Sequence, residues 1–168
     1  MMQLRRLKGT VKRWWRGRGF GVHSPFAFYF ITRVLRERLP YYAYADKLLG
    51  SGGRNERKEL RTLFRVICYF APRKVWLAGC APRVAEVIRL ADSRICVDCG
   101  EAPFAVVGPG FAGELPAGYD VAVFMSGAGE QAMREWRRVE HGMHFTNGRM
   151  TVIVRRRDFT PQSYEVNF

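Results

Sequence analysis

Hydrophobic residues recur along this chain with two periods, one typical of helices and one typical of buried strands. Spacings of three and four place apolar residues on one face of three segments: 56–70, 83–91 and 129–142. Short apolar runs predict strands at 74–79, 94–99, 104–108, 119–125, 149–157 and 163–168. The last two are expected to pair as an antiparallel hairpin through residues 158–162. Strands that alternate with helices and end in such a pair predict an α/β fold with a mostly parallel sheet.

The helical segments also predict which side chains face the core. The buried set is expected to be Leu60, Leu63, Phe64, Ile67, Cys68, Val84, Val87, Ile88, Ala91, Ala132, Met133, Trp136 and Val139. Upstream, Ser24 followed by Pro25 is a helix start signal, because the serine hydroxyl caps the helix and proline fits its first turn. The buried face of that helix would carry Phe26, Phe30, Val34 and Leu35, and Pro40 would end it.

The glycine-rich stretch at residues 50–55 is the clearest joint in the chain. It predicts an N-terminal helical extension over residues 1–53 and an α/β body over residues 54–168. Within the extension, residues 3–16 carry Leu, Val and Trp on one side of a helix and Arg and Lys around the rest. Such a basic amphipathic helix either docks on its own domain or lies on an anionic membrane surface, and the pattern is compatible with both.

Charge is the part of the composition that changes this picture. The 168 residues hold 28 Lys and Arg against 15 Asp and Glu, a formal net charge of +13. Such a charge favours anionic partners: nucleic acid, a membrane surface or an acidic protein. The basic residues 5–18 also contain tryptophans, which suit both base stacking and a membrane surface. No run is apolar enough for a bilayer span or a secretory signal, so we expect a cytoplasmic or peripheral protein with four reduced cysteines.

Residues 75–100 have the order of parts found in nucleotide-cofactor half-sites: strand, turn, helix, strand and an acid. Gly79 ends the first strand, and Asp98 ends the second at about the spacing of a ribose-binding acid. The turn has a single glycine, however, and Pro82 and Arg83 stand where the backbone should approach a ligand. Proline removes an N–H donor. The arginine side chain would project into or across the pocket.

Five segments of the chain carry a family resemblance: the His-Ser-Pro-Phe signature within 19–35, then 75–91, 97–100, 119–127 and 149–168. Together they resemble, nearly end to end, a bacterial group of class I S-adenosylmethionine-dependent methyltransferases with an N-terminal helical extension. The resemblance implies a Rossmann-like sheet that binds S-adenosylmethionine and transfers its methyl group to an unidentified acceptor.

The same resemblance implies which residues would form the site. The cofactor contacts would be Gly79, Cys80, Ala81, Asp98 and Cys99, with Gly79 at the cofactor's amino-acid end and Asp98 at its ribose. His23 and Ser24 would line a substrate cleft. The alternative for His23 is that it fixes its own loop by hydrogen bonding to the backbone.

The chain departs from the family's pattern at several positions. Leu77 stands where the first motif has an acid, Arg83 replaces the second glycine, and Met125 replaces an aspartate after the fourth strand. Only residues 99–103 join Asp98 to the next strand, where the fold normally has a helix. The link before the closing hairpin also looks too short for the usual helix, strand and helix. Removing a polar interaction from a closed site costs about 1–3 kcal/mol, so the departures favour weakened or lost catalysis.

The cysteines and histidines add no further site. Cys96 and Cys99 form a lone CxxC pair, so buried thiols are favoured over zinc or redox chemistry, and no metal is expected. His141 and His144 lack a third ligand nearby in the sequence. The sequence thus leaves two functions. One is a methyltransferase with weakened or lost catalysis, and the other is a non-catalytic basic module for nucleic acid, an anionic membrane surface or a protein partner.

Overall fold

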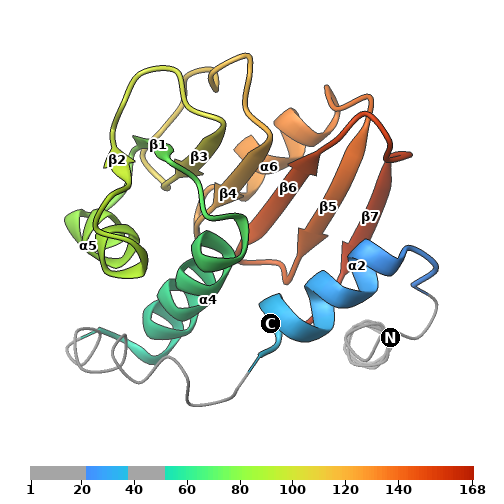
Figure 1. Cartoon of the computed structure of the whole chain (residues 1–168), viewed down its shortest axis with the longest axis horizontal. Helices are drawn as coiled ribbons and strands as arrows, with labels where there is room; N and C mark the ends of the chain where they lie inside the picture. Colours follow the sequence, from blue (N-terminus) through green and yellow to red (C-terminus); the bar gives the residue numbers. More distant parts are fainter. Residues whose placement is uncertain (1–21, 38–51) are drawn as a thin grey trace, which may run out of the picture.

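The computed structural model describes residues 22–37 and 52–168, which form an α/β fold (Figure 1). The predicted helix over 3–16 and the helix end at Pro40 lie outside these residues. The elements are α2 (Pro25–Tyr29), η1 (Phe30–Leu35), α4 (Arg54–Phe70), β1 (Lys74–Ala78), α5 (Pro82–Ala91), β2 (Cys96–Val97), β3 (Phe104–Val107), β4 (Val121–Phe124), α6 (Gly129–Trp136), β5 (Gly142–Thr146), β6 (Thr151–Arg155) and β7 (Gln162–Glu165).

The seven strands form one sheet in the order β2-β1-β3-β4-β6-β5-β7. Neighbours are parallel from β2 to β4, β6 is antiparallel to both β4 and β5, and β7 is parallel to β5. The predicted mostly parallel α/β sheet is therefore confirmed, and its arrangement is compatible with a Rossmann-like fold.

The predicted hairpin between residues 149–157 and 163–168 is wrong. The antiparallel hairpin joins β5 to β6, with Thr146 opposite Thr151. Because β6 pairs with β4 along one edge and β5 along the other, it offers no edge to β7. The chain crosses over instead, and β7 adds to the outer edge of β5.

Strand β5 is absent from the elements that the sequence predicts, because the helical spacing over 129–142 runs up to its first residue. The helix α6 stops at Trp136, and the short segment that follows leads into five strand residues, of which Gly142, Met143, His144 and Phe145 are buried. The link before β6 is therefore long enough to hold a helix and a strand.

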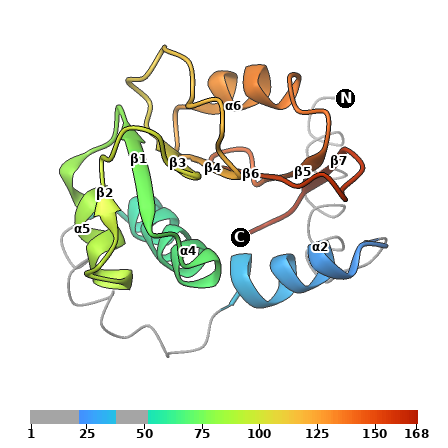
Figure 2. The ribbon, with the colours of Figure 1, turned by 45° about the horizontal axis from the view of Figure 1, so that its top comes forward.

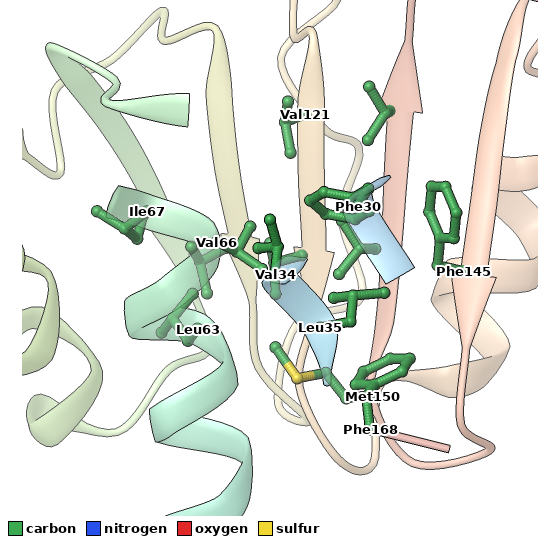
Figure 3. Close-up of a cluster of buried hydrophobic side chains, with 14 of the residues drawn as sticks. Phe30, Val34, Leu35, Leu63, Val66, Ile67, Val121, Phe145, Met150 and Phe168 are labelled. Carbon is green, nitrogen blue, oxygen red and sulfur yellow. The ribbon is translucent and has the colours of Figure 1, made fainter. Parts of the chain in front are cut away.

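Helices cover the two faces of the sheet unequally. Figure 2 shows α2, α4 and α5 on one face and α6 on the other. The larger core lies on the first face, where Phe30, Leu35, Leu63 and Ile67 pack on the strands and Phe145 is among their partners (Figure 3). The smaller core under α6 is built from Ala105, Val107, Ala122, Phe124, Ala128, Ala132 and Ile153.

The start of α2 follows the sequence signal. The Ser24 hydroxyl accepts a hydrogen bond from the Ala27 N–H, and Pro25 opens the first turn. The continuing η1 is anchored to α4 by Arg65, whose guanidinium donates to the carbonyls of Val34 and Leu35 at 2.7 and 2.9 Å. Residues 22–37 therefore share one core with the sheet.

Two predicted core residues are exposed. Cys68 lies on the open side of α4, and Met133 on α6 is 45% exposed. On α4 the buried face is rotated away from Cys68, because Thr62 and Val66 are buried instead. On α6 the buried residues are Gln131 and Ala132, so Met133 lies at the edge of the buried face. None of the described helices combines the length and the apolarity that crossing a bilayer requires.

Candidate cofactor site

The candidate site lies where β1 ends and the chain turns into α5. Gly79 follows β1 directly and has φ +61, a conformation that a side chain would strain. The order β2-β1-β3 reverses the direction of winding between β1 and β3. In open α/β sheets this switch point is the usual ligand-binding place, beyond the carboxyl ends of the strands. The predicted turn at Gly79 is thus at the expected position.

The same place is filled by the chain itself. Gly108, the residue after β3, donates its N–H to the Ala78 carbonyl at 2.8 Å. A Cβ added to Gly108 would lie 1.9 Å from the Gly79 oxygen, and one added to Gly79 would lie 2.6 Å from the Phe111 nitrogen. The turns after β1 and β3 are therefore in backbone contact, and Gly79 gives room to the turn after β3.

The turn after β4 closes the crevice further. Gly127 has φ +90, and a Cβ there would lie 2.7 Å from the Pro109 side chain. Met125, the residue after β4, is 7% exposed and packs in the larger core. Its N–H continues the sheet by donating to the Val107 carbonyl at 2.8 Å. The turns that follow the carboxyl ends of β1, β3 and β4 are thus in contact with one another.

Phe111 covers this region with an apolar side chain. Its ring meets Trp76 of β1 edge to face, with 5.2 Å between centroids. A Cβ on Gly113 would lie 2.7 Å from the same ring, so the loop folds closely around it. Gln131 of α6 holds the loop by donating from Nε2 to the Gly113 carbonyl at 2.7 Å.

Cys80 and Ala81 complete the turn without polar groups aimed outward. The Cys80 Sγ lies 3.4 Å from the Val106 carbonyl and 3.5 Å from the Ala78 carbonyl. Burial raises the pKa of this thiol to about 11, so it stays protonated at neutral pH. Ala81 is the N-cap of α5 and has no side chain that could cap it, and Pro82 lacks an N–H.

The Arg83 side chain lies toward the start of α4, where it forms an ion pair with Glu56 at 3.4 Å. Another carboxylate of α4, Glu59, accepts a hydrogen bond from the Ser126 N–H at 3.3 Å. Sequence reasoning missed both acids because nothing in the helical pattern of 56–70 distinguishes them from ordinary surface residues. Glu59 thus places a carboxylate at the turn after β4, and Glu56 places one beside Arg83 of α5.

Asp98 follows β2, and its N–H donates to the Val75 carbonyl at 2.8 Å. It is exposed and has φ +62. Because Val97 pairs with Val75, Asp98 lies beside Trp76, whereas Gly79 is three residues further along β1. That is roughly 10 Å along the strand direction. The two predicted cofactor residues thus follow the ends of two paired parallel strands, but they lie at different positions along the strand direction.

The cysteines on either side of Asp98 differ from the sequence expectation. Cys96 and Cys99 are joined by a disulfide, with 6.0 Å between their Cα atoms, and Cys96 is exposed. The expected reduced, buried thiols are therefore wrong for this pair. The spacing of a CxxC motif brings two sulfur atoms together once the strand ends and the backbone turns, which happens here at Asp98.

His23 and Ser24 lie at the other end of the sheet. The Ser24 Oγ is 4.0 Å from the Met143 Sδ, and Met143 is connected through the pairing of β5, β6 and β4 to Val121, the first residue of β4. This is the amino end of the parallel strands. The structure does not bring the exposed His23 or Ser24 together with Gly79 and Asp98.

His144 is the histidine with an unusual environment. It is 2% exposed, its Nδ1 lies 2.8 Å from the Ser163 Oγ, and its Nε2 has no hydrogen-bond partner within residues 22–37 and 52–168. The ring stacks on Trp136 with 5.3 Å between centroids. His141, by contrast, is exposed. Among the described residues no three His, Cys, Asp or Glu side chains gather as a metal site.

Comparison with known proteins does not assign this chain to a family. No family model matches the chain, and neither the curated proteins nor the solved structures contain a significant match.

Proposed function

We propose that this chain is a methyltransferase-like protein that has lost S-adenosylmethionine binding and acts as a non-catalytic binding protein for an anionic membrane surface. The methyltransferase part of the proposal rests on the sequence resemblance and on a sheet compatible with a Rossmann-like fold. The loss of the cofactor rests on the closed switch point, and the partner rests on charge and exposed aromatic residues.

The contact between Gly79 and Gly108 is the observation that carries the loss. A ligand at the switch point needs the space above Gly79 that residues 108–111 occupy. Opening it would break the Phe111–Trp76 pair and the hydrogen bond from Gln131 to Gly113. Aromatic pairs contribute about 0.5–1.5 kcal/mol beyond burial, and a hydrogen bond about 1 kcal/mol. Cofactor binding would have to supply this free energy first.

The residues around the turn provide few polar groups that could bind the cofactor. Met125 is buried in the core, and Cys80 is directed at strand carbonyls rather than outward. Asp98 alone keeps a carboxylate of the expected type, and it is set back along the strand from Gly79. A single charged contact contributes about 1.5–3 kcal/mol. By itself this corresponds to a Kd weaker than about 1 mM.

Three exposed aromatic side chains support a membrane partner. Phe28 and Tyr29 of α2 are 47% and 52% exposed, and Tyr69 of α4 is 38% exposed. Tyr29 and Tyr69 lie 6.0 Å apart between ring centroids. The guanidinium of Arg156 lies nearby, 5.9 Å from the Phe26 ring, which itself contacts Tyr69. Aromatic rings and arginines are the side chains favoured at the boundary of an anionic bilayer.

The chain's net charge of +13 would add long-range attraction to an anionic bilayer. The Trp- and Arg-containing residues 3–16 lie close in sequence to α2 and have the composition of an interfacial segment. These sequence features favour a membrane over an acidic protein, because an acidic protein would not require the aromatic residues.

The cofactor part is tested by calorimetric titration of the full chain with S-adenosylmethionine and with its demethylated product. We expect no binding at millimolar ligand, and an identical trace for Asp98→Ala. Micromolar binding that is lost in Asp98→Ala would instead establish a cofactor site and overturn this part of the proposal.

The membrane part is tested by sedimentation with vesicles of phosphatidylglycerol or of phosphatidylcholine. We expect binding to the anionic vesicles only, weakened about tenfold in a Tyr29→Ser, Tyr69→Ser double variant. Met133→Ser is the matched control, because Met133 is similarly exposed but lies on α6, across the sheet. If mixed oligonucleotides bind and anionic vesicles do not, the partner is nucleic acid and the membrane assignment fails.

A further inference from the structure

The Cys96–Cys99 disulfide closes a small ring at the end of the edge strand β2. Cys96 is exposed and Cys99 half-buried, and β2 pairs with β1 along one side only within the described part of the chain. Cys96 therefore lies at the protein surface, where a small molecule can reach this residue while the protein stays folded. An accessible disulfide is the kind that exchanges with external thiols.

The other two cysteines, Cys68 and Cys80, lack the features that would make them sites of thiol–disulfide exchange. Cys80 is half-buried and directed at the carbonyls of Ala78 and Val106, and burial raises the pKa of its thiol. Cys68 is exposed, but burial of its sulfur and the nearby Asp92 carboxylate raise its pKa. Neither is bonded to a second cysteine. Both therefore serve as internal controls for the pair.

We infer that Cys96 and Cys99 form a dithiol–disulfide site that exchanges with low-molecular-weight thiols in the folded protein. In reduction, the thiolate of one external thiol attacks Cys96 Sγ, the Cys96–Cys99 bond breaks, and Cys99 leaves as a thiolate. A second external thiol attacks the mixed disulfide and forms the external disulfide, and Cys96 leaves as a thiolate. The protein gains two electrons, and the protons of the two external thiols pass to Cys96 and Cys99. Oxidation by a small disulfide is the reverse.

The ring also determines the backbone around Asp98. This residue lies between the bonded cysteines in a left-handed conformation, which is strained for a residue other than glycine. Opening the ring removes one constraint on that conformation. The redox site does not depend on the proposed function, because exchange requires only access to Cys96 and not an open crevice.

The test uses the full chain equilibrated in buffers of reduced and oxidised glutathione at a series of ratios. Samples are acid-quenched, denatured and alkylated, and the alkyl groups are counted by intact mass. We expect four groups on the reduced protein, which has four cysteines, and two on the oxidised protein. Far-UV circular dichroism should stay unchanged across the series, so that the exchange is assigned to the folded state.

Variants assign the transition to the pair. Cys96→Ser and Cys99→Ser should each abolish the intramolecular transition, whereas Cys68→Ser and Cys80→Ser should each keep a change of two groups. Four alkyl groups at every glutathione ratio would show that the disulfide does not form and would overturn the inference. A disulfide that is reduced only after denaturant is added would overturn it equally, since the bond would then be structural.

Discussion

Ala71 and Asp98 are the non-glycine residues with a left-handed backbone in the described part of the chain, with φ 44 and 62. Both lie where an element ends: Ala71 at the C-terminus of α4 and Asp98 after β2. At such positions a side chain is tolerated because the surrounding hydrogen bonds fix the turn. The Ala71 N–H donates to the Ile67 carbonyl at 2.8 Å, which closes the last turn of α4.

Ala71→Gly should therefore raise the free energy of unfolding by about 0.5–1 kcal/mol, because glycine adopts this cap conformation without strain. Urea denaturation measures the change. Ala85→Gly, in the interior of α5, is the matched control and should lower the free energy of unfolding by about 1 kcal/mol. Equal effects of the two substitutions would contradict the role given to the backbone conformation.

His144 makes a second residue-scale prediction. Its burial lowers its pKa to about 4 from an ordinary value of 6.5, against a smaller opposing effect of the Glu165 carboxylate. The unfolded chain thus binds a proton below about pH 6.5 that the folded chain does not bind. The contribution of His144 to the free energy of unfolding is therefore fully present above pH 6.5. It is lost as the pH falls toward 4, which lowers the free energy of unfolding by roughly 2–3 kcal/mol.

His144→Phe removes this titration while keeping a ring beside Trp136. We expect the free energy of unfolding of the variant to fall less than that of the wild type between pH 6.5 and 4.5. A His144→Phe slope equal to that of the wild type would show that this histidine is not the linked group.

At the scale of elements, the turns after β1, β3 and β4 act as one unit. Each has a glycine where another turn approaches: Gly79, Gly108 and Gly127. A strand end that packs on a neighbouring turn has no room for a Cβ, so these glycines are required by packing. The helices are less constrained, since α6 meets the sheet through small residues such as Ala128 and Ala132.

Gly108→Ala should lower the free energy of unfolding by about 3 kcal/mol or more, because the new Cβ would overlap the Gly79 oxygen at 1.9 Å. Gly110→Ala lies in the same loop and meets nothing within 4 Å, so its effect should stay within about 0.5 kcal/mol. Chemical denaturation of both variants decides the point. A mild effect at position 108 would mean that the turns separate easily, which would favour an accessible crevice.

At the scale of the whole molecule, the net charge of +13 is a property that no single element explains. Like charges at this density repel one another in the compact state, and salt screens the repulsion. The few ion pairs that the structure has between described surface residues, such as Arg156–Asp158 at 2.7 Å and Arg94–Asp92 at 2.9 Å, are exposed and contribute little.

The melting temperature should therefore rise as sodium chloride is increased from about 10 to 150 mM, the range in which the Debye length falls from roughly 30 to 8 Å. Differential scanning calorimetry provides the measurement. Sucrose at the same osmolarity is the control for effects unrelated to charge. A melting temperature that falls with salt would show that attractive charge pairs dominate over the net repulsion.

Local pattern was sufficient for much of the fold. The apolar runs at β1, β3, β4 and β6, the helices α4 and α5 and the Ser24 cap are confirmed, because each depends on residues adjacent in sequence. The predicted partner of β7 is wrong, because strand partners depend on which edges remain open after β4, β5 and β6 have assembled. No local signal carries that information.

For the candidate site, the sequence determined the positions of Gly79 and Asp98 at the ends of two adjacent parallel strands and the apolar side chains of Leu77 and Met125. Only the tertiary structure decided that the turns after β1, β3 and β4 meet at this place. Gly108 reads as an ordinary turn glycine, and nothing in its neighbours reveals contact with a turn 29 residues earlier (108 minus 79). Chemical type is a property of each residue, whereas the space left for a ligand depends on how distant segments pack.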